Sequence, residues 1–274
     1  MRYRLRIALL GGAGWLLMAG AGRAHAQRGP LVADRPDFTE AAATVGRGVF
    51  QLEFGYTYEY DRPEGSLGGG VWTHSLGEPL LRVGVLSETL ELRLGLSPVS
   101  VGAGADGRSV TETGLEDLYM GVKLVLTEQD GLRPATAILP QMTVPTGSDA
   151  FTSDRTLPGL NFIYGWDLAE NVVLAGSTQM NRALSESGGG ASAYSQWTQS
   201  VVAGFSLGER AGVYTEWFAH FHAEPEGTRA EHYANGGLTW SLGDDLQWDI
   251  RAGLGLNESA TGVFLGTGLV VRMR

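Results

Sequence analysis

The stretch LQWDIRAGLGLN, from Leu246 to Asn257, sorts its side chains strictly by position. One set is apolar: Leu246, Trp248, Ile250, Ala252, Leu254 and Leu256. The other set is polar or glycine: Gln247, Asp249, Arg251, Gly253, Gly255 and Asn257. Because successive side chains of a strand point to opposite faces, this alternation predicts a β-strand with two unlike faces. In a soluble barrel the leucines would point inward. In a membrane barrel they would face lipid, and Asp249 and Arg251 would line the interior.

The N-terminus has the pattern of an export signal. MRYRLR carries three arginines, IALLGGAGWLLMAGA is apolar, and small residues at Ala24–Ala26 precede Gln27. This pattern predicts a cleaved signal peptide over residues 1–26. A retained membrane helix is the alternative, and the short, glycine-containing apolar run disfavours it.

Composition excludes several classes of protein. Residues 1–26 contain four of the twenty basic residues and no acidic ones, so the formal net charge falls from −10 to −14 on cleavage. That balance argues against nucleic acid as a partner. The chain has no cysteine, which excludes small disulfide-rich secreted scaffolds. Its 41 glycines exclude a long helical protein, because each costs about 1 kcal/mol at a helical site.

Alternation with a period of two recurs along the rest of the chain. It predicts twelve strands at about 48–60, 71–86, 89–97, 114–127, 134–145, 157–168, 171–181, 194–207, 211–222, 232–242, 246–256 and 262–273. Long connections are expected at Asp61–Gly70, Pro98–Thr113, Thr146–Thr156, Arg182–Ala193 and Ala223–Glu231, with short turns between them. Outer-membrane barrels alternate short periplasmic turns with longer loops in this way.

The two faces of these strands differ in charge. The face opposite the apolar one collects Glu53, Glu59, Glu91, Arg93, Asp117, Lys123, Asp167, Glu216, Asp249, Arg251 and Arg272. Burying so many ions in a dry core would cost several kcal/mol each, whereas a water-filled interior keeps them hydrated. We therefore expect an all-β fold: a transmembrane, antiparallel, up-and-down β-barrel of about twelve strands over residues 47–274. In the second strand the apolar positions change phase, which a bulge near Gly77–Pro79 would explain.

Three stretches together carry a family resemblance. They are ADRPDFTE (Ala33–Glu40), GLEDLYMGVK (Gly114–Lys123) and VPTGSDAF (Val144–Phe151). In this order the chain resembles the meta-pathway phenol-degradation family of outer-membrane transporters. The resemblance implies a passive channel for aromatic or other small organic compounds and offers no catalytic residues. One departure is the end of the chain, Met273-Arg274, where many outer-membrane barrels have an aromatic residue.

Residues 27–46 precede the barrel and contain four charged residues within ADRPDFTE: Asp34, Arg35, Asp37 and Glu40. Pro36 and the acidic residues suit an extended segment. It is either a periplasmic tail or a segment that folds back into the lumen and pairs with the wall. The resemblance favours the second interpretation.

Other chemistry has weaker support. His220 and His222 share one strand face, with His232 across the next loop, so a metal site at the mouth is conceivable; a hydrated polar rim is favoured, and no metal or cofactor is predicted. A barrel lipid hydrolase would need a Ser–His pair. His74 and Ser75 are adjacent in a strand and point apart, and the sequence has no GxSxG elbow, so an enzyme is not expected.

The sequence thus predicts a channel in the bacterial outer membrane for passive uptake of small organic solutes, aromatic ones being what the resemblance implies. A non-conducting structural or adhesive barrel is the alternative, and a lipid hydrolase a weaker one. The expected partners are outer-membrane lipid, small organic solutes and the outer-membrane assembly machinery. The expected lumen-lining residues are Glu53, Glu91, Arg93, Asp117, Lys123, Glu216, Asp249 and Arg251, with Asp34, Arg35, Asp37 and Glu40 in the lumen segment and His220 and His222 at the mouth.

Overall fold

A computed structural model describes residues 31–61, 69–105, 108–185, 192–224, 227–260 and 262–273. The predicted signal peptide lies outside these residues. Every regular element in the described part is a β-strand. Within that part, no helix is long and apolar enough to cross a membrane.

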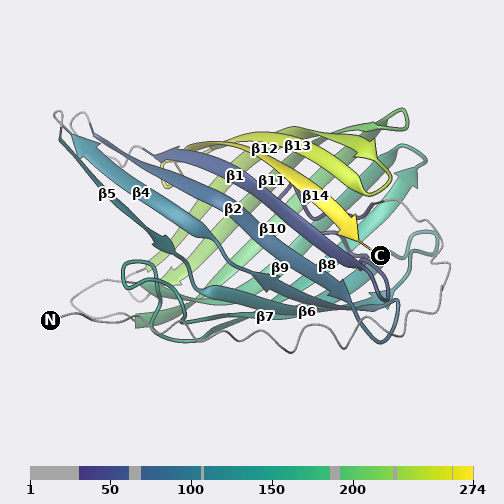
Figure 1. Cartoon of the computed structure of the whole chain (residues 1–274), viewed down its shortest axis with the longest axis horizontal. Helices are drawn as coiled ribbons and strands as arrows, with labels where there is room; N and C mark the ends of the chain where they lie inside the picture. Colours follow the sequence, from purple (N-terminus) through teal and green to yellow (C-terminus); the bar gives the residue numbers. More distant parts are fainter. Residues whose placement is uncertain are drawn as a thin grey trace, which may run out of the picture. The chain divides into compact units, whose positions relative to one another are not determined.

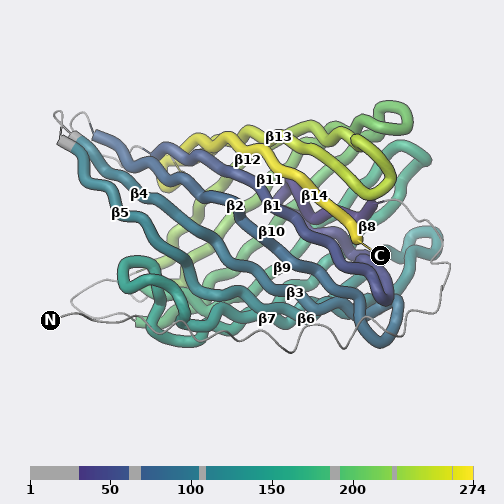
Figure 2. The backbone as a smooth tube through the Cα atoms, in the orientation of Figure 1, coloured from purple at the N-terminus to yellow at the C-terminus, as the bar shows by residue number. Residues whose placement is uncertain are grey.

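The strands form one closed antiparallel barrel (Figure 1). Strand β1 (Phe50–Asp61) closes it by pairing with β14 (Val263–Met273) on one side and with β2 (Gly70–Gly84) on the other. The strands between follow one another up and down, and the tube view in Figure 2 shows their common tilt. Seven of them are β7 (Ala135–Val144), β8 (Leu157–Ala169), β9 (Val172–Ser185), β10 (Ser192–Leu207), β11 (Ala211–Glu224), β12 (Gly227–Gly243) and β13 (Leu246–Gly255).

Two neighbouring positions of the barrel wall are each divided into two strands. Strands β3 (Leu90–Gly95) and β4 (Pro98–Ala105) pair in turn with the two halves of β2. Strands β5 (Arg108–Leu115) and β6 (Leu118–Thr127) pair with β4 and β3 respectively. Fourteen strands therefore occupy twelve barrel positions, which confirms the predicted twelve-stranded barrel.

Two of the five predicted long connections are wrong. Residues 98–113 were expected to be a loop because they are rich in glycine. Most of them instead belong to strands β4 and β5, which pair with each other, and β4 also pairs with the first half of β2. Residues 223–231 were expected to be a loop because of their charge, but β11 and β12 continue into them and pair as far as Glu224 and Gly227. Outside an apolar layer, an antiparallel pair can be polar on both faces, so alternation gives no signal there.

The predicted bulge in β2 is confirmed. Between the pairs Glu53–Leu80 and Gly55–Gly77, the two residues Glu78 and Pro79 lie opposite the single residue Phe54, so β2 contains one extra residue there. Gly77 and Glu78 both have positive φ, at 83° and 38°. The bulge restores the apolar phase of β2 and, further along the strand, leaves Arg82 buried on the inner face.

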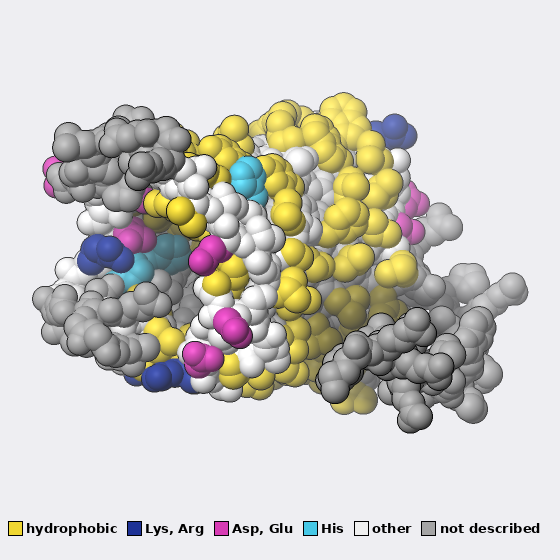
Figure 3. Space-filling model, turned by 60° about the vertical axis from the view of Figure 1, so that its left-hand side comes forward, with side chains coloured by type: hydrophobic (Ala, Val, Ile, Leu, Met, Phe, Trp, Pro, Cys, Tyr) yellow, Lys and Arg dark blue, Asp and Glu magenta, His cyan; other side chains and the backbone are white. Residues whose placement is uncertain are grey.

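The apolar face of the barrel is its outer face. Hydrophobic side chains cover most of the wall visible in Figure 3, and many of the charged ones lie toward its ends. In the stretch that opened the sequence analysis, Leu254 is 50% exposed whereas Asp249 is fully buried. The apolar part of the interior is small: Ala137, Leu139 and Ile163 pack together, with Ala42 against them.

A pair of arginine substitutions tests this assignment of faces. Val201, in the middle of β10, is 41% exposed on the outer face, and Val201→Arg should destabilise the barrel folded in lipid by about 2–4 kcal/mol. Gln179, on the adjacent strand, bonds to Asn181 on the inner face, so Gln179→Arg should cost much less. Urea titrations of refolding into lipid vesicles would measure both costs. An equal or larger cost for Gln179→Arg would contradict the assignment.

Candidate functional site

Residues 31–48, the N-terminal segment, run through the inside of the barrel. The backbone N–H groups of Phe38 and Thr39 each donate to the Glu216 carboxylate of β11, at 2.7 Å. Across the barrel, the Asp34 carboxylate lies 3.3 Å from Lys123 Nζ of β6. The segment therefore spans the interior, and bonds to facing strands hold it.

Asp34 is the centre of the contacts between segment and wall. Its carboxylate accepts from Arg93 Nη2 at 2.6 Å and lies 3.2 Å from Arg82 Nη1 and 3.3 Å from Lys123 Nζ. Its backbone N–H donates to Glu53 at 3.1 Å. Burial alone would raise the pKa of Asp34, but the three cations outweigh burial and hold the pKa well below its usual range. Asp34 is thus a charged group inside a cage of opposite charge.

The wall residues of this cage are buried and bonded to one another. Arg82 makes a two-pronged contact with Glu91, from Nε at 2.8 Å and from Nη2 at 3.0 Å, and Arg82 Nη1 donates to Glu53 at 2.8 Å. Glu53, Arg82, Glu91, Arg93 and Lys123 are each no more than 2% exposed. The expectation of a water-filled interior is therefore wrong at this level. Ion pairs and hydrogen bonds replace hydration as compensation for the buried charges.

Arg35 makes a second group of contacts between segment and wall, beside the seam where β1 pairs with β14. Its Nη1 donates to Glu78 at 2.7 Å, so the β2 bulge supplies one of its partners. A Cβ atom added at Gly55 or Gly268 would lie 2.4 Å or 2.3 Å from the guanidinium. These two glycines, on β1 and β14, therefore make the space that the arginine occupies.

Asp37 lies beside an already negative group. Glu216 accepts four hydrogen bonds, from the N–H groups of Phe38 and Thr39, the Thr39 hydroxyl and the Asn235 amide. Burial, together with the charges of Glu216, Asp34 and Glu53, raises the pKa of Asp37 well above its usual range. The seated segment consequently favours the protonated form of Asp37.

This arrangement predicts that rising pH weakens the seating of the segment. Released from the barrel, Asp37 regains its ordinary pKa, so between the ordinary and the raised value the seated form holds a proton that the released form lacks. Any conductance that depends on release should therefore increase as pH rises from about 4. Asp37→Asn should flatten that increase, which planar-bilayer recordings between pH 4 and 8 would measure. A pH dependence identical in both proteins would contradict this role.

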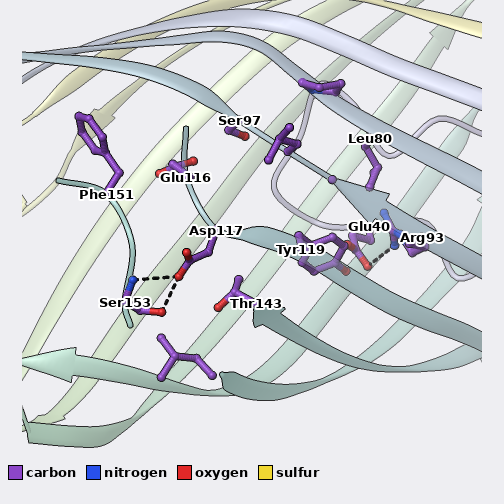
Figure 4. Close-up of a pocket in the computed structure, with 14 residues that line it drawn as sticks. Glu40, Leu80, Arg93, Ser97, Glu116, Asp117, Tyr119, Thr143, Phe151 and Ser153 are labelled. Carbon is purple, nitrogen blue, oxygen red and sulfur yellow. Dashed lines mark hydrogen bonds and ion pairs between the residues drawn. The ribbon is translucent and has the colours of Figure 1, made fainter. Parts of the chain in front are cut away.

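A cavity of about 470 Å³ lies where the two wall positions are interrupted (Figure 4). Glu40 of the segment and Arg93 of β3 border it at one end, joined by an ion pair of 2.9 Å. Phe151 and Ser153 border it from the loop after β7. Its other lining residues are Pro79, Leu80, Gly95, Leu96, Ser97, Glu116, Asp117, Tyr119, Thr143 and Leu157.

Asp117 fastens the loop after β7 to this interruption. Its carboxylate accepts from the N–H groups of Thr146, Gly147 and Ser153, at 2.9 to 3.1 Å, and from the Ser153 hydroxyl. Two of the stretches that carried the family resemblance, around Asp117 and around Gly147, are therefore in direct contact. Asp117 lies outside the caged network and faces the loop.

The two histidines predicted at the mouth lie on the inner side of β11. Their ring centroids are 6.3 Å apart; His220 bonds to Thr198, and His222 bonds to Tyr194. His232 instead stacks on Trp217 and does not join them. Among the residues the structure describes, no three His, Cys, Asp or Glu side chains are grouped to hold a metal.

The remaining predicted residues fall into two groups, and some partners were missed. Glu53, Glu91, Arg93 and Lys123 bond to one another or to Asp34, whereas Glu216, Asp249 and Arg251 bond to the rest of the segment: Arg251 Nη1 donates to the Pro36 carbonyl at 3.2 Å. Sequence reasoning missed Arg82, Glu78 and Tyr119. The phase change in β2 is a signal that, followed through the bulge, would have placed Arg82 inside.

Comparison with known proteins gives a family match and a set of related folds. The family model described as "Putative MetA-pathway of phenol degradation" matches residues 33–273. This range includes all three stretches quoted in the sequence analysis. None of the curated proteins matches the sequence.

Solved outer-membrane barrels share the fold. The translocator domain of the autotransporter NalP from Neisseria meningitidis has a TM-score of 0.57 at 11% identity, over 83% of this chain and 89% of that one. The transport unit of the autotransporter AIDA-I from Escherichia coli has a TM-score of 0.50 at 9% identity, over 86% and 94%. The NanC porin has a TM-score of 0.49 at 11% identity, over 81% and 98%. At such identity the likeness to the two autotransporter barrels, whose TM-scores are 0.50 or more, shows the fold alone.

Proposed function

Since the chain belongs to the family described as "Putative MetA-pathway of phenol degradation", as its three motifs predicted, we propose that it is a passive channel in the bacterial outer membrane for small organic solutes, aromatic ones among them. Residues 1–26 would direct export and be cleaved off in the process, and the outer-membrane assembly machinery would insert the barrel into lipid. The proposal assigns no chemical step to the protein.

One observation carries this proposal: the N-terminal segment lies in a polar interior and is held there mainly by hydrogen bonds and ion pairs. Hydrogen bonds and ion pairs hold most of the segment to the wall, and its apolar contacts include Ala42 against the small apolar core and the Phe38 ring stacked on Phe218. Hydrogen bonds and ion pairs can exchange for water one at a time, unlike a continuous apolar interface. We therefore propose that Glu53, Glu91, Arg93, Lys123, Glu216, Asp249 and Arg251 line the path when the segment shifts, with Asp117 beside the cavity and His220 and His222 near the outer opening.

Charge would set the selectivity of that path. On the inner wall alone, the carboxylates outnumber the cations: Glu53, Glu78, Glu91, Glu216 and Asp249 against Arg82, Arg93, Lys123 and Arg251. An acidic lining repels small anions and admits cations or neutral solutes. Neutral ring compounds would then be limited mainly by size and by local apolar patches.

The bonds that hold the segment across the interior favour one rival function, a non-conducting structural barrel. In that case the segment would remain seated under all conditions. Deleting residues 27–42 separates the two hypotheses: a channel should gain conductance, with potassium preferred over chloride, whereas Asp34→Asn should give an intermediate gain. Planar-bilayer recordings, with heat-modifiable gel mobility as the folding control, would measure this. Silent membranes for the folded deletion variant would support the structural barrel.

A disulfide lock tests whether the segment itself must move. The Thr39 and Ser200 hydroxyl oxygens are 2.7 Å apart, and the natural chain has no cysteine, so Thr39→Cys with Ser200→Cys can form a single defined bridge. Oxidation should abolish conductance and reduction should restore it, while Thr39→Cys alone should respond to neither. Full conductance in the oxidised double variant would show that solutes pass around a fixed segment.

A further inference from the structure

We infer that the cavity at the interrupted wall is a binding site for a neutral solute of one ring that carries a hydrogen-bond donor, and that it discriminates against carboxylates. This inference rests on the proposed function and gives that function a location and a preference. Its support comes from the wall, the lining and the charges of the cavity.

The wall at the cavity is discontinuous. Strands β3 and β4 are separated at Leu96 and Ser97, and β5 and β6 are separated at Glu116 and Asp117, at the same level of the barrel. One backbone hydrogen bond of 2.9 Å, from Glu116 N–H to the Ser97 carbonyl, joins the two interruptions. Beyond it, within the described residues, β5 has β4 as its one partner strand. The regular ladder is therefore replaced here by side chains around a space.

The lining has an apolar part and a polar part. Leu80, Leu96 and Leu157 supply aliphatic surface, and Phe151 and Tyr119 supply aromatic rings from opposite ends of the cavity (Figure 4). The volume of about 470 Å³ lies in the range of small-molecule sites, roughly 300–1,000 Å³. Apolar walls with a few convergent polar groups are how proteins bind a ring and orient its substituent.

The charges favour a neutral occupant. Arg93 is the cation at the cavity, and Asp34 at 2.6 Å and Glu40 at 2.9 Å already neutralise it. Three carboxylates, of Glu40, Glu116 and Asp117, border the space. A second anion would have to displace Glu40 and face the other two. A hydroxyl group can instead donate to one of these carboxylates without bringing a charge.

The absence of natural cysteine allows a direct test of occupancy. Ser97→Cys places a thiol in the cavity, and Ser109→Cys places a control thiol on the exposed part of β5. Phenol should slow maleimide labelling of Ser97→Cys several-fold, and toluene and benzoate should slow it less. None of the three should alter labelling of Ser109→Cys. Equal protection of both thiols, or better protection by benzoate than by phenol, would overturn the inference.

A second variant addresses the lining itself. Phe151→Ala, combined with Ser97→Cys, should weaken protection by phenol, whereas Leu132→Ala, in an exposed turn, should leave protection unchanged. Conductance of the unlabelled proteins keeps this test separate from the proposed function. Conduction without protection would refute the binding site alone, and protection in a barrel that never conducts would refute the channel alone.

Discussion

The pairing of Asp34 with Arg82, Arg93 and Lys123 is the interaction on which the rest of the interior depends. Without that carboxylate, the buried cations of three adjacent wall positions would lack part of their compensation, and removing one partner of such a group costs about 3–5 kcal/mol. The barrel wall and the segment are therefore complementary: the wall supplies mainly cations at this level, and the segment supplies the anion. The same dependence explains why charged wall residues can be buried in a barrel whose outer face is apolar.

The sequence allowed the barrel, its strand number and its outer face to be predicted, because an apolar layer requires strict alternation wherever a strand crosses it. LQWDIRAGLGLN and its partner strands show this requirement most clearly. Outside that layer a strand does not need to alternate apolar and polar residues. For this reason the β4–β5 pair and the ends of the β11–β12 pair were mistaken for loops. Alternation in a sequence shows that the two faces of a strand have different surroundings. A strand with polar surroundings on both faces therefore has no such pattern.

The interior was predictable as a list of residues and unpredictable as a set of partners. Alternation places Glu53, Lys123 and Glu216 on one face, but their partners come from a segment that has no periodicity of its own. The inward position of Arg82 was hidden by the bulge, where Glu78 and Pro79 lie opposite one residue of β1 and the single extra residue shifts the phase of β2. The cavity could not be predicted from the sequence, because it forms where two wall positions are interrupted. The stretches around Glu40, Asp117 and Phe151 come together there only in the folded barrel.

The seat of Arg35 has a consequence for the order in which the molecule is made. Its guanidinium lies against Gly55 of the first strand and Gly268 of the last, and it bonds to Asp249 of the last strand but one. That seat does not exist until the two ends of the sheet have met. The N-terminal segment precedes every strand in the sequence, yet this contact can form only after β14 has paired with β1. Arg35 is made before the barrel strands but therefore docks after the last of them has paired, and its docking indicates that the seam between β1 and β14 is complete.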